Sequence, residues 1–165
     1  MSCRPALLAL CLAPLPLAAD PMPVAVFDLS FINFSQEVEY GASNAAEEAR
    51  IKMLSAHLRQ RLADSGRYAL IDTGALAQKL DMHGEVFTCN HCEAAMAREI
   101  GAELSFTGAV QKLSVLVQTV ILRERDAATG DIVALYQTDI RGNTDIAWKR
   151  GLDFLIDNRV LTETH

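Results

Sequence analysis

The sequence predicts an α/β (α+β) fold, in which helices pack on a mixed β-sheet of about five strands in the order β-α-β-α-β-β-β-α. Two observations lead to this prediction. An apolar run, an amphipathic helix and a second apolar run follow one another between residues 22 and 74, which is typical of a right-handed parallel unit. Two runs of alternating polarity flank "DAATGD" at residues 126–131, which predicts an antiparallel hairpin.

The first half of the chain starts with a buried strand over residues 22–32, "MPVAVFDLSFI". A long helix follows, because four apolar residues recur on one face at helical spacing, and these are Ile51, Leu54, Leu58 and Leu62. Asn44 and Glu47 have the spacing of a capping box at its start, and Gly66 stands where a terminating glycine is expected. Residues 68–74 predict the second strand.

The second half holds a short helix and a loop over residues 75–88, then a helix from about Asn90 to Ile100. Strands are predicted within residues 102–114 and on both sides of the 126–131 turn. Residues 143–161 predict a closing helix with Asn143 or Thr144 as its N-cap. Its inward-facing residues are Trp148, Leu152, Leu155 and Ile156.

The first nineteen residues have the pattern of a cleaved secretory signal peptide. Arg4 precedes a short apolar run, and small residues at Ala18 and Ala19 offer a cleavage site before Asp20. The run is too short to span a bilayer, which takes about 20 apolar residues. We therefore expect residues 1–19 to be removed and residues 20–165 to form a single exported domain without a stable membrane insertion.

The net charge of the chain is −6, and no basic stretch interrupts it. An acidic chain without a basic patch is a poor binder of phosphate backbones, so we expect no nucleic-acid partner. The sequence also contains no "GxSxG" context, no glycine-rich phosphate loop and no arrangement that suggests a catalytic triad. We therefore expect no catalytic residues and no enzymatic activity.

Cys89 and Cys92 are the cysteines that remain after cleavage, and an exported protein with one pair most simply forms a disulfide. Two other interpretations stay open. A thiol at the start of a helix has a lowered pKa, which suits thiol redox chemistry, and His91 would add a hydrogen-bond donor. Thiolate, imidazole and thioether ligands select copper, or zinc, and the candidates are Met82, His83, Cys89, His91 and Cys92.

Four polar residues gather where the last predicted strand passes into the last helix: Asp139, Arg141, Asn143 and Asp145. Strand-to-helix junctions often bind ligands, so these residues are candidates for a partner or ligand site. Helix capping explains each of them without a ligand and is the favoured interpretation. The nearby "RERD" at residues 123–126 is interpreted as a solvated strand edge.

Two segments carry a family resemblance: "CNHCEAAMAREIGAELSFTGAVQKLS" and "LRERDAATGDIVALYQTDIRGNTDIAWKRGLDFL". They resemble a family of uncharacterised, secreted proteobacterial proteins. More distantly, the chain is similar to the amino-terminal domain of the Tol-Pal propeller protein and the periplasmic domain of the curli secretion lipoprotein. The shared pattern comprises Gly101-Ala102, the stretch from Gly108 to Ser114, and the turn at Ala128 to Gly130.

The resemblance implies a periplasmic binding and assembly module in a Gram-negative bacterium. We therefore expect a non-catalytic accessory protein that acts through a periplasmic protein partner and needs no cofactor. The alternative is an accessory protein for copper, zinc or thiol redox chemistry that uses Cys89 and Cys92.

Overall fold

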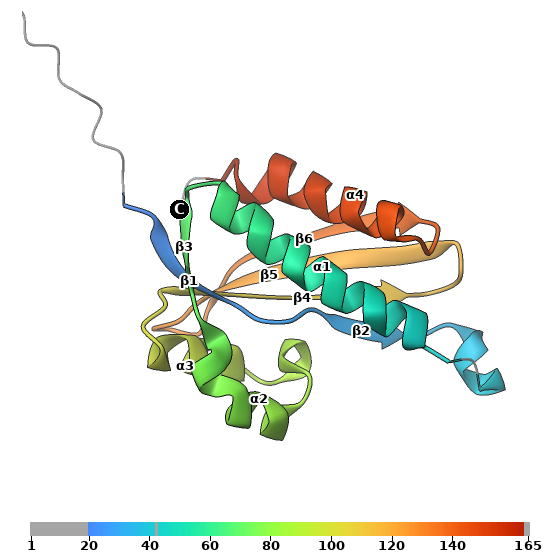
Figure 1. Ribbon diagram of the computed structural model, residues 1–165, viewed down its shortest axis with the longest axis horizontal. Helices are drawn as coiled ribbons and strands as arrows, with labels where there is room; N and C mark the ends of the chain where they lie inside the picture. Colours follow the sequence, from blue (N-terminus) through green and yellow to red (C-terminus); the bar gives the residue numbers. More distant parts are fainter. Residues whose placement is uncertain (1–19, 42, 164–165) are drawn as a thin grey trace, which may run out of the picture.

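A six-stranded mixed β-sheet with helices on both faces forms the fold (Figure 1). The structure is a computed structural model that describes residues 20–41 and 43–163, so the predicted signal peptide lies outside the described residues. The strands are β1 (Met22–Val26), β2 (Ser30–Asn33), β3 (Tyr68–Ile71), β4 (Leu104–Lys112), β5 (Val117–Asp126) and β6 (Ile132–Arg141). The α-helices are α1 (Ala45–Asp64), α2 (Ala77–His83), α3 (Cys92–Glu99) and α4 (Asp145–Leu155).

The strand order is β3-β1-β4-β5-β6, and β2 pairs with β4 beyond the end of β1. The pairings of β1 with β3 and β4 are parallel, whereas β4, β5 and β6 form an antiparallel meander. Both the parallel unit and the hairpin predicted from the sequence are therefore confirmed, together with the mixed α/β class. Gly108 lies in β4, where an added Cβ would come 2.4 Å from the carbonyl oxygen of Ile121, so the close approach of β4 and β5 requires glycine there.

The predicted first strand is broken in two, which explains why the sheet has six strands rather than about five. The Phe27 backbone N–H still donates to the carbonyl oxygen of Phe106, at 3.0 Å. Two residues later, the Leu29 N–H donates instead to the Ser55 hydroxyl of α1, at 2.9 Å. The chain therefore leaves the β1 register between these residues and re-enters the sheet as β2.

The main hydrophobic core lies between the sheet and the helices α1 and α4, which cover the same face (Figure 1). The apolar face predicted for α1 is buried there, and Trp148 of α4 is 0% exposed. The Trp148 ring stacks on Phe31 of β2, with ring centroids 5.9 Å apart. The inward orientation predicted for the closing helix is therefore confirmed.

A smaller core lies on the opposite face, under α2, α3 and two 3-10 turns, η2 (Thr73–Leu76) and η3 (Val86–Thr88). Its buried residues are Ala25, Phe27, Leu76, Val86, Met96, Ala97, Ala102 and Ala127. Cys89 and Cys92 pack against its border. These elements cover only the end of the sheet at which β3 and β1 pair (Figure 1).

The helix ends differ from the prediction at the start of α1. The predicted capping box does not form: Asn44 is the N-cap residue without a side-chain cap, and its Oδ1 accepts a hydrogen bond from Asn33 Nδ2. Glu47 is buried and binds Lys112 of β4 instead. The other predicted end signals hold, since Thr144 caps α4 through the Ala147 N–H and Gly66 adopts φ +66° after α1.

Candidate functional site

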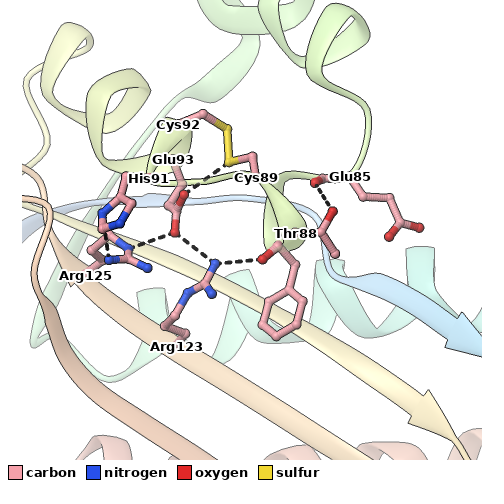
Figure 2. The surroundings of a disulfide bond; sticks show 9 residues. Glu85, Thr88, Cys89, His91, Cys92, Glu93, Arg123 and Arg125 are labelled. Atoms are coloured by element: carbon pink, nitrogen blue, oxygen red, sulfur yellow. Dashed lines mark hydrogen bonds and ion pairs between the residues drawn. A yellow bond between two sulfur atoms is a disulfide. The ribbon is translucent and has the colours of Figure 1, made fainter.

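The sequence-predicted cysteine site lies where η3 passes into α3 (Figure 2). A disulfide joins Cys89, which follows η3, to Cys92, the first residue of α3, with the two Cα atoms 5.7 Å apart. Between them, His91 adopts φ +68°, which is uncommon for a residue with a Cβ. This left-handed residue turns the chain sharply, so α3 begins at Cys92 and not at the predicted Asn90.

A fully buried carboxylate, Glu93, lies directly beside the disulfide (Figure 2). One of its oxygens, Oε1, accepts hydrogen bonds from Arg123 Nη2 and Arg125 Nε, each at 2.9 Å. The other, Oε2, lies 3.2 Å from Cys89 Sγ. Since two guanidinium groups meet one carboxylate, the charged groups of this cluster carry an excess of positive charge.

The prediction that residues 123–126 form a solvated edge is wrong. β5 is an inner strand, paired with β4 on one side and β6 on the other, so its charged residues do not reach an open edge. Arg123 and Arg125 project from one face of β5 toward α3, because residues two apart on a strand share a face. Glu124 projects to the opposite face and is 0% exposed within the main core.

Arg123 is held by three kinds of contact. Besides Glu93, its guanidinium donates to the carbonyl oxygen of Phe87 and lies over the Phe87 ring, 4.7 Å from the centroid. Burial lowers the pKa of Arg123, and the Arg125 charge adds to this effect, although the charge of Glu93 partly offsets it. The η3 turn, α3 and β5 are therefore joined through a single side chain.

His91 connects α3 to the turn between β5 and β6. Its Nδ1 lies 3.1 Å from both Arg125 Nη1 and the Gly130 carbonyl oxygen. An unprotonated Nδ1 accepts from Arg125, and a protonated Nδ1 would donate to Gly130 while facing a guanidinium charge. Arg98 adds a hydrogen bond to the carbonyl oxygen of Ala128 in the same turn.

The predicted metal ligands are only partly brought together. Ligand atoms of Cys89, Cys92 and Glu93 lie within 4.8 Å of one another. Glu93 was not among the predicted ligands, whereas His83 ends α2 as an exposed residue outside this group. The two sulfur atoms are bonded to each other, and Glu93 already binds two cations, so the arrangement disfavours a further cation in the oxidised form.

The predicted strand-to-helix site divides into two parts. Asn143 and Asp145 meet α1: Arg50 donates to Asn143 Oδ1 at 2.6 Å and to Asp145 Oδ1 at 2.7 Å. By contrast, Asp139 accepts a hydrogen bond from the Thr119 hydroxyl of the neighbouring strand, and Arg141 is exposed at the end of β6. The four residues therefore do not form one site.

A buried ion pair explains the position of Asn143. Glu47 Oε1 accepts hydrogen bonds from Asn143 Nδ2 at 2.6 Å and from Lys112 Nζ at 2.9 Å. Although burial works to raise the pKa of Glu47, the hydrogen bonds from Lys112 and Asn143 outweigh it and lower that pKa. Burial likewise works to lower the pKa of Lys112, and its bonds to Glu37 and Glu47 raise it. This network fastens α1 to the sheet and to α4, which favours the capping and packing interpretation of Asn143 over a ligand site.

The largest group of exposed apolar side chains in the described part of the chain is not predicted from the sequence. It lies at the end of the sheet where β4 turns into β5, beside the 3-10 turn η1 (Gln36–Tyr40) and the start of α4 (Figure 1). We call this surface the apolar tip, and its residues are Phe34, Val38, Tyr40, Leu113, Val115, Leu116, Val117 and Ile146. Tyr40 is 85% exposed and Leu116 is 71% exposed.

Backbone hydrogen bonds bring the three segments of the apolar tip together. The Phe34 N–H donates to the carbonyl oxygen of Lys112, next to Leu113. The Gly142 N–H, just before α4, donates to the carbonyl oxygen of Leu116. The signal in the sequence is "LSVLV", which is apolar although it forms a turn, where polar residues are the rule.

Comparison with solved structures shows the same fold in several bacterial proteins. The LpoB C-terminal domain from Salmonella enterica aligns with a TM-score of 0.53 and 16% identity, over 74% of this chain and 84% of that chain. Lipoprotein GNA1162 from Neisseria meningitidis gives 0.51 and 14%, over 88% and 100% of the two chains. The PelC dodecamer from Paraburkholderia phytofirmans gives 0.50 and 15%, over 91% and 94%.

Two further comparisons concern the sequence itself. No curated protein sequence matches the chain. Within residues 20–41 and 43–163, no helix has the length and apolar character that a membrane span requires. The specific likeness to the Tol-Pal and curli proteins stays a prediction. The profile of the DUF3280 family, described as "Protein of unknown function (DUF2380)", matches residues 22–160, and the chain therefore belongs to this family.

Proposed function

We propose that this protein is a non-catalytic accessory module of the periplasm that binds a protein partner through the apolar tip. The observation that carries the proposal is the tip itself, which gathers eight of the thirteen large, exposed apolar side chains among the described residues at one end of the molecule. Large exposed apolar side chains that gather at one end of a soluble protein often mark a site of interaction. Aromatic side chains such as Phe34 and Tyr40 are typical anchors of protein interfaces.

The charges around the apolar tip favour a protein over a lipid surface. Glu37 and Asp145 lie beside it and are partly exposed, with Arg141 as the neighbouring exposed cation. The chain as a whole carries a net charge of −6. Anionic lipid headgroups attract basic segments, so this surface is poorly matched to them.

Proteins that share the fold support the proposal without defining the partner. GNA1162 is a lipoprotein and PelC is a dodecamer, so the fold occurs both in a lipoprotein and in an assembly of many subunits. The signal-peptide pattern of residues 1–19 and the likeness to a lipoprotein are consistent with export. Export to the periplasm is part of the proposal.

Site-specific photo-cross-linking in the organism that makes the protein tests the proposal. A benzophenone amino acid replaces Leu116 in the apolar tip, and the matched control replaces Phe154, which is 49% exposed on α4. We expect one discrete protein adduct from position 116 and none from position 154. Val115→Asp in the same chain should remove the adduct, because a charge in the contact would be left desolvated.

Three results would contradict the proposal. Equal adducts from both positions, or none from either, would mean that the apolar tip has no specific partner. Attachment of lipid at position 116 would assign the tip to a membrane. An adduct of twice the mass of the chain would replace the accessory role with self-association of this protein through the apolar tip.

A second candidate function uses Cys89 and Cys92 for thiol redox chemistry or for copper or zinc. The observation that favours it is the Glu93 carboxylate, 3.2 Å from Cys89 Sγ, which could accept a hydrogen bond from a Cys89 thiol after reduction. In that reaction a dithiol donor transfers two electrons and two protons to the disulfide and itself becomes a disulfide.

Thiol counting and metal analysis on protein isolated from the periplasm separate the two candidates. The binding module should be isolated oxidised, without a stoichiometric metal. A reduced pair with a thiol pKa well below about 8.5, or one copper or zinc ion per chain, would instead favour the second candidate.

A further inference from the structure

The outer edge of β2 opens into a cleft of about 590 Å³. One wall is α1, which contributes Ile51, Lys52, Ser55 and other residues of the same helix face. The opposite wall is the segment from η2 to η3, with Leu80 and Val86. The volume lies in the range of about 300 to 1,000 Å³ that is usual for binding pockets.

The cleft is lined by the first two residues of β2, Ser30 and Phe31, whose backbone carries hydrogen-bonding groups. Among the described strands, β2 pairs only with β4. The Phe34 N–H points to β4, and because successive residues of a strand point their backbone groups to opposite edges, those of Phe31 and Asn33 point away from β4. Leu29 follows the same alternation, since its N–H donates away from β4 to the Ser55 hydroxyl.

The sheet has a vacant place beside β2. β3 fills the corresponding place beside β1, with Met22 to Ala25 opposite Tyr68 to Ile71. It then stops, because Asp72 Oδ1 accepts from the Gly74 N–H and starts η2, which leads the chain away from the sheet. A strand placed in the cleft would therefore continue the line of β3 and complete the sheet on that side.

We propose that the cleft binds an extended segment of a partner protein, which adds to the sheet as a strand along β2. The chemistry of the edge selects this occupant, because Phe31, which lines the cleft, and Asn33, just beyond its lining, direct main-chain N–H and C=O groups away from β4. β2 has four residues, so the matched part of the segment is about four residues long.

The walls of the cleft define the side chains of the segment. An added strand has α1 over one face and the η2-to-η3 segment over the other, so both sets of alternate side chains are covered. Strands covered on both faces are apolar throughout, which predicts consecutive apolar residues, with β-branched ones favoured. The charged residues that line the cleft are Asp28, Glu48, Lys52, Arg59 and Glu85. Arg59 pairs with Asp28, which leaves two acids and one base, so a basic residue flanking the apolar run fits best.

The other long free edge of the sheet serves as an internal comparison. β6 is an edge strand of ten residues and its pairing partner is β5 alone. Its outer edge does not contribute to the cleft. β2 differs from β6 because its first two residues, Ser30 and Phe31, line a walled cleft.

Selection from a phage-displayed library of linear peptides of about eight residues tests the proposal on the exported protein. We expect selected peptides with a short apolar run and a basic flank. Lys52 lines the cleft and is exposed, so Lys52→Trp should obstruct the cleft and weaken peptide binding at least about tenfold. The matched control is Gln60→Trp, at an exposed position of the same helix outside the cleft, which should leave peptide binding unchanged. Only alternate amides of the bound peptide face β2. N-methyl groups on those amides should abolish binding, whereas N-methyl groups on the other set of alternate amides should leave it unchanged.

The outcomes separate this inference from the proposed function. Both involve a protein partner, but the apolar tip and the cleft use different residues. Leu116→Asp should leave peptide binding unchanged, and Lys52→Trp should leave the position-116 adduct unchanged. Failure to select peptides, binding that is insensitive to Lys52→Trp, or binding without an alternating N-methyl pattern would overturn strand addition. Self-association abolished by Lys52→Trp would replace the partner segment with a second copy of the chain.

Discussion

At the scale of single residues, Glu93 joins most of the elements around the disulfide. Its carboxylate is fully buried and holds Arg123 and Arg125 of β5. Moving a charged group from water into the protein interior costs free energy, and an ion pair offsets this cost only while both partners are present. Removing the one anion leaves two guanidinium groups with no counter-charge.

Glu93→Gln should therefore lower the free energy of unfolding by roughly 3 to 5 kcal/mol, measured by chemical denaturation at neutral pH. The matched control is Glu99→Gln, since Glu99 lies on the same helix and pairs with Lys79 at the exposed surface. The control should change stability by about 1 kcal/mol or less. Equal effects of the two substitutions would show that the buried cluster contributes no more than a surface ion pair.

Glu124 gives a pH-dependent prediction. Burial raises the pKa of Glu124 to about 7, although the hydrogen bond with Tyr136 and the charge of Arg67 work to lower it. The folded state then holds this proton more tightly than the unfolded state, whose pKa is near 4.5. The contribution of Glu124 to stability is therefore present below about pH 4.5 and is lost as the pH rises to about 7.

The comparison with Glu124→Gln isolates this effect from other titrating groups. Between about pH 5 and pH 8, the free energy of unfolding of the wild type should fall by roughly 2 to 3 kcal/mol relative to that of the variant. Urea denaturation at several pH values measures it. Parallel stability curves for the two proteins would mean that Glu124 titrates normally.

These residues show the limit of prediction at this scale. The alternation in "RERD" correctly places Arg123 and Arg125 on one face of a strand and Glu124 on the other. Whether that strand is at an edge or inside the sheet depends on which distant segments pair with it. The local alternation of residues gives no information about that pairing. The buried Glu93 was missed for the same reason, since α3 meets β5 only after the sheet is assembled.

At the scale of elements, the disulfide acts on one short segment. It closes a loop of four residues at the start of α3. In the chain-entropy description, a loop this short contributes about 2 kcal/mol at most. α3 is also held by Glu93, by Arg98 and by burial of Met96, so the disulfide is one of several attachments.

Cys89→Ser combined with Cys92→Ser should leave a folded protein that is less stable by about 2 kcal/mol or less. Hydrogen exchange should show lost protection around residues 82–95, while the amides of β4 and β5 keep theirs. Global loss of protection would mean that the cysteines hold the whole fold.

Element types were easier to predict than element ends. The apolar spacing of α1 and the alternation of β5 and β6 are determined by burial on one face, which the sequence displays directly. The capping box at Asn44 and Glu47 failed because Lys112, 65 positions away, binds the Glu47 side chain. The first strand was predicted as continuous because its apolar run does not show that Ser55 takes the Leu29 N–H.

At the scale of the whole molecule, one tryptophan connects the two halves of the main core. Trp148 is fully buried, stacks on Phe31 and lies under the Arg50 guanidinium, 5.1 Å from the ring centroid. α1, β2 and α4 therefore meet at a single side chain.

Trp148→Ala should lower the free energy of unfolding by roughly 3 to 5 kcal/mol, because it leaves a large cavity between these elements. Phe154→Ala is the control on the same helix, since Phe154 is about half exposed and its truncation should cost much less. Thermal or chemical denaturation measures both. An unchanged melting temperature for Trp148→Ala would contradict the packing described here.

The direction of the strands also determines how the molecule responds to mechanical force. β1 begins at the end of the sheet opposite the apolar tip, and the strands run lengthwise between the two ends (Figure 1). A pull between the start of β1 and a partner held at the tip therefore acts along the strands, while the hydrogen bonds of the parallel ladders of β1 and of the antiparallel ladder of β4 and β5 join neighbouring strands sideways. Such a load is a shear, in which the ladders on both sides of β4 resist together instead of opening one bond at a time. A module built this way can keep hold of a partner under tension.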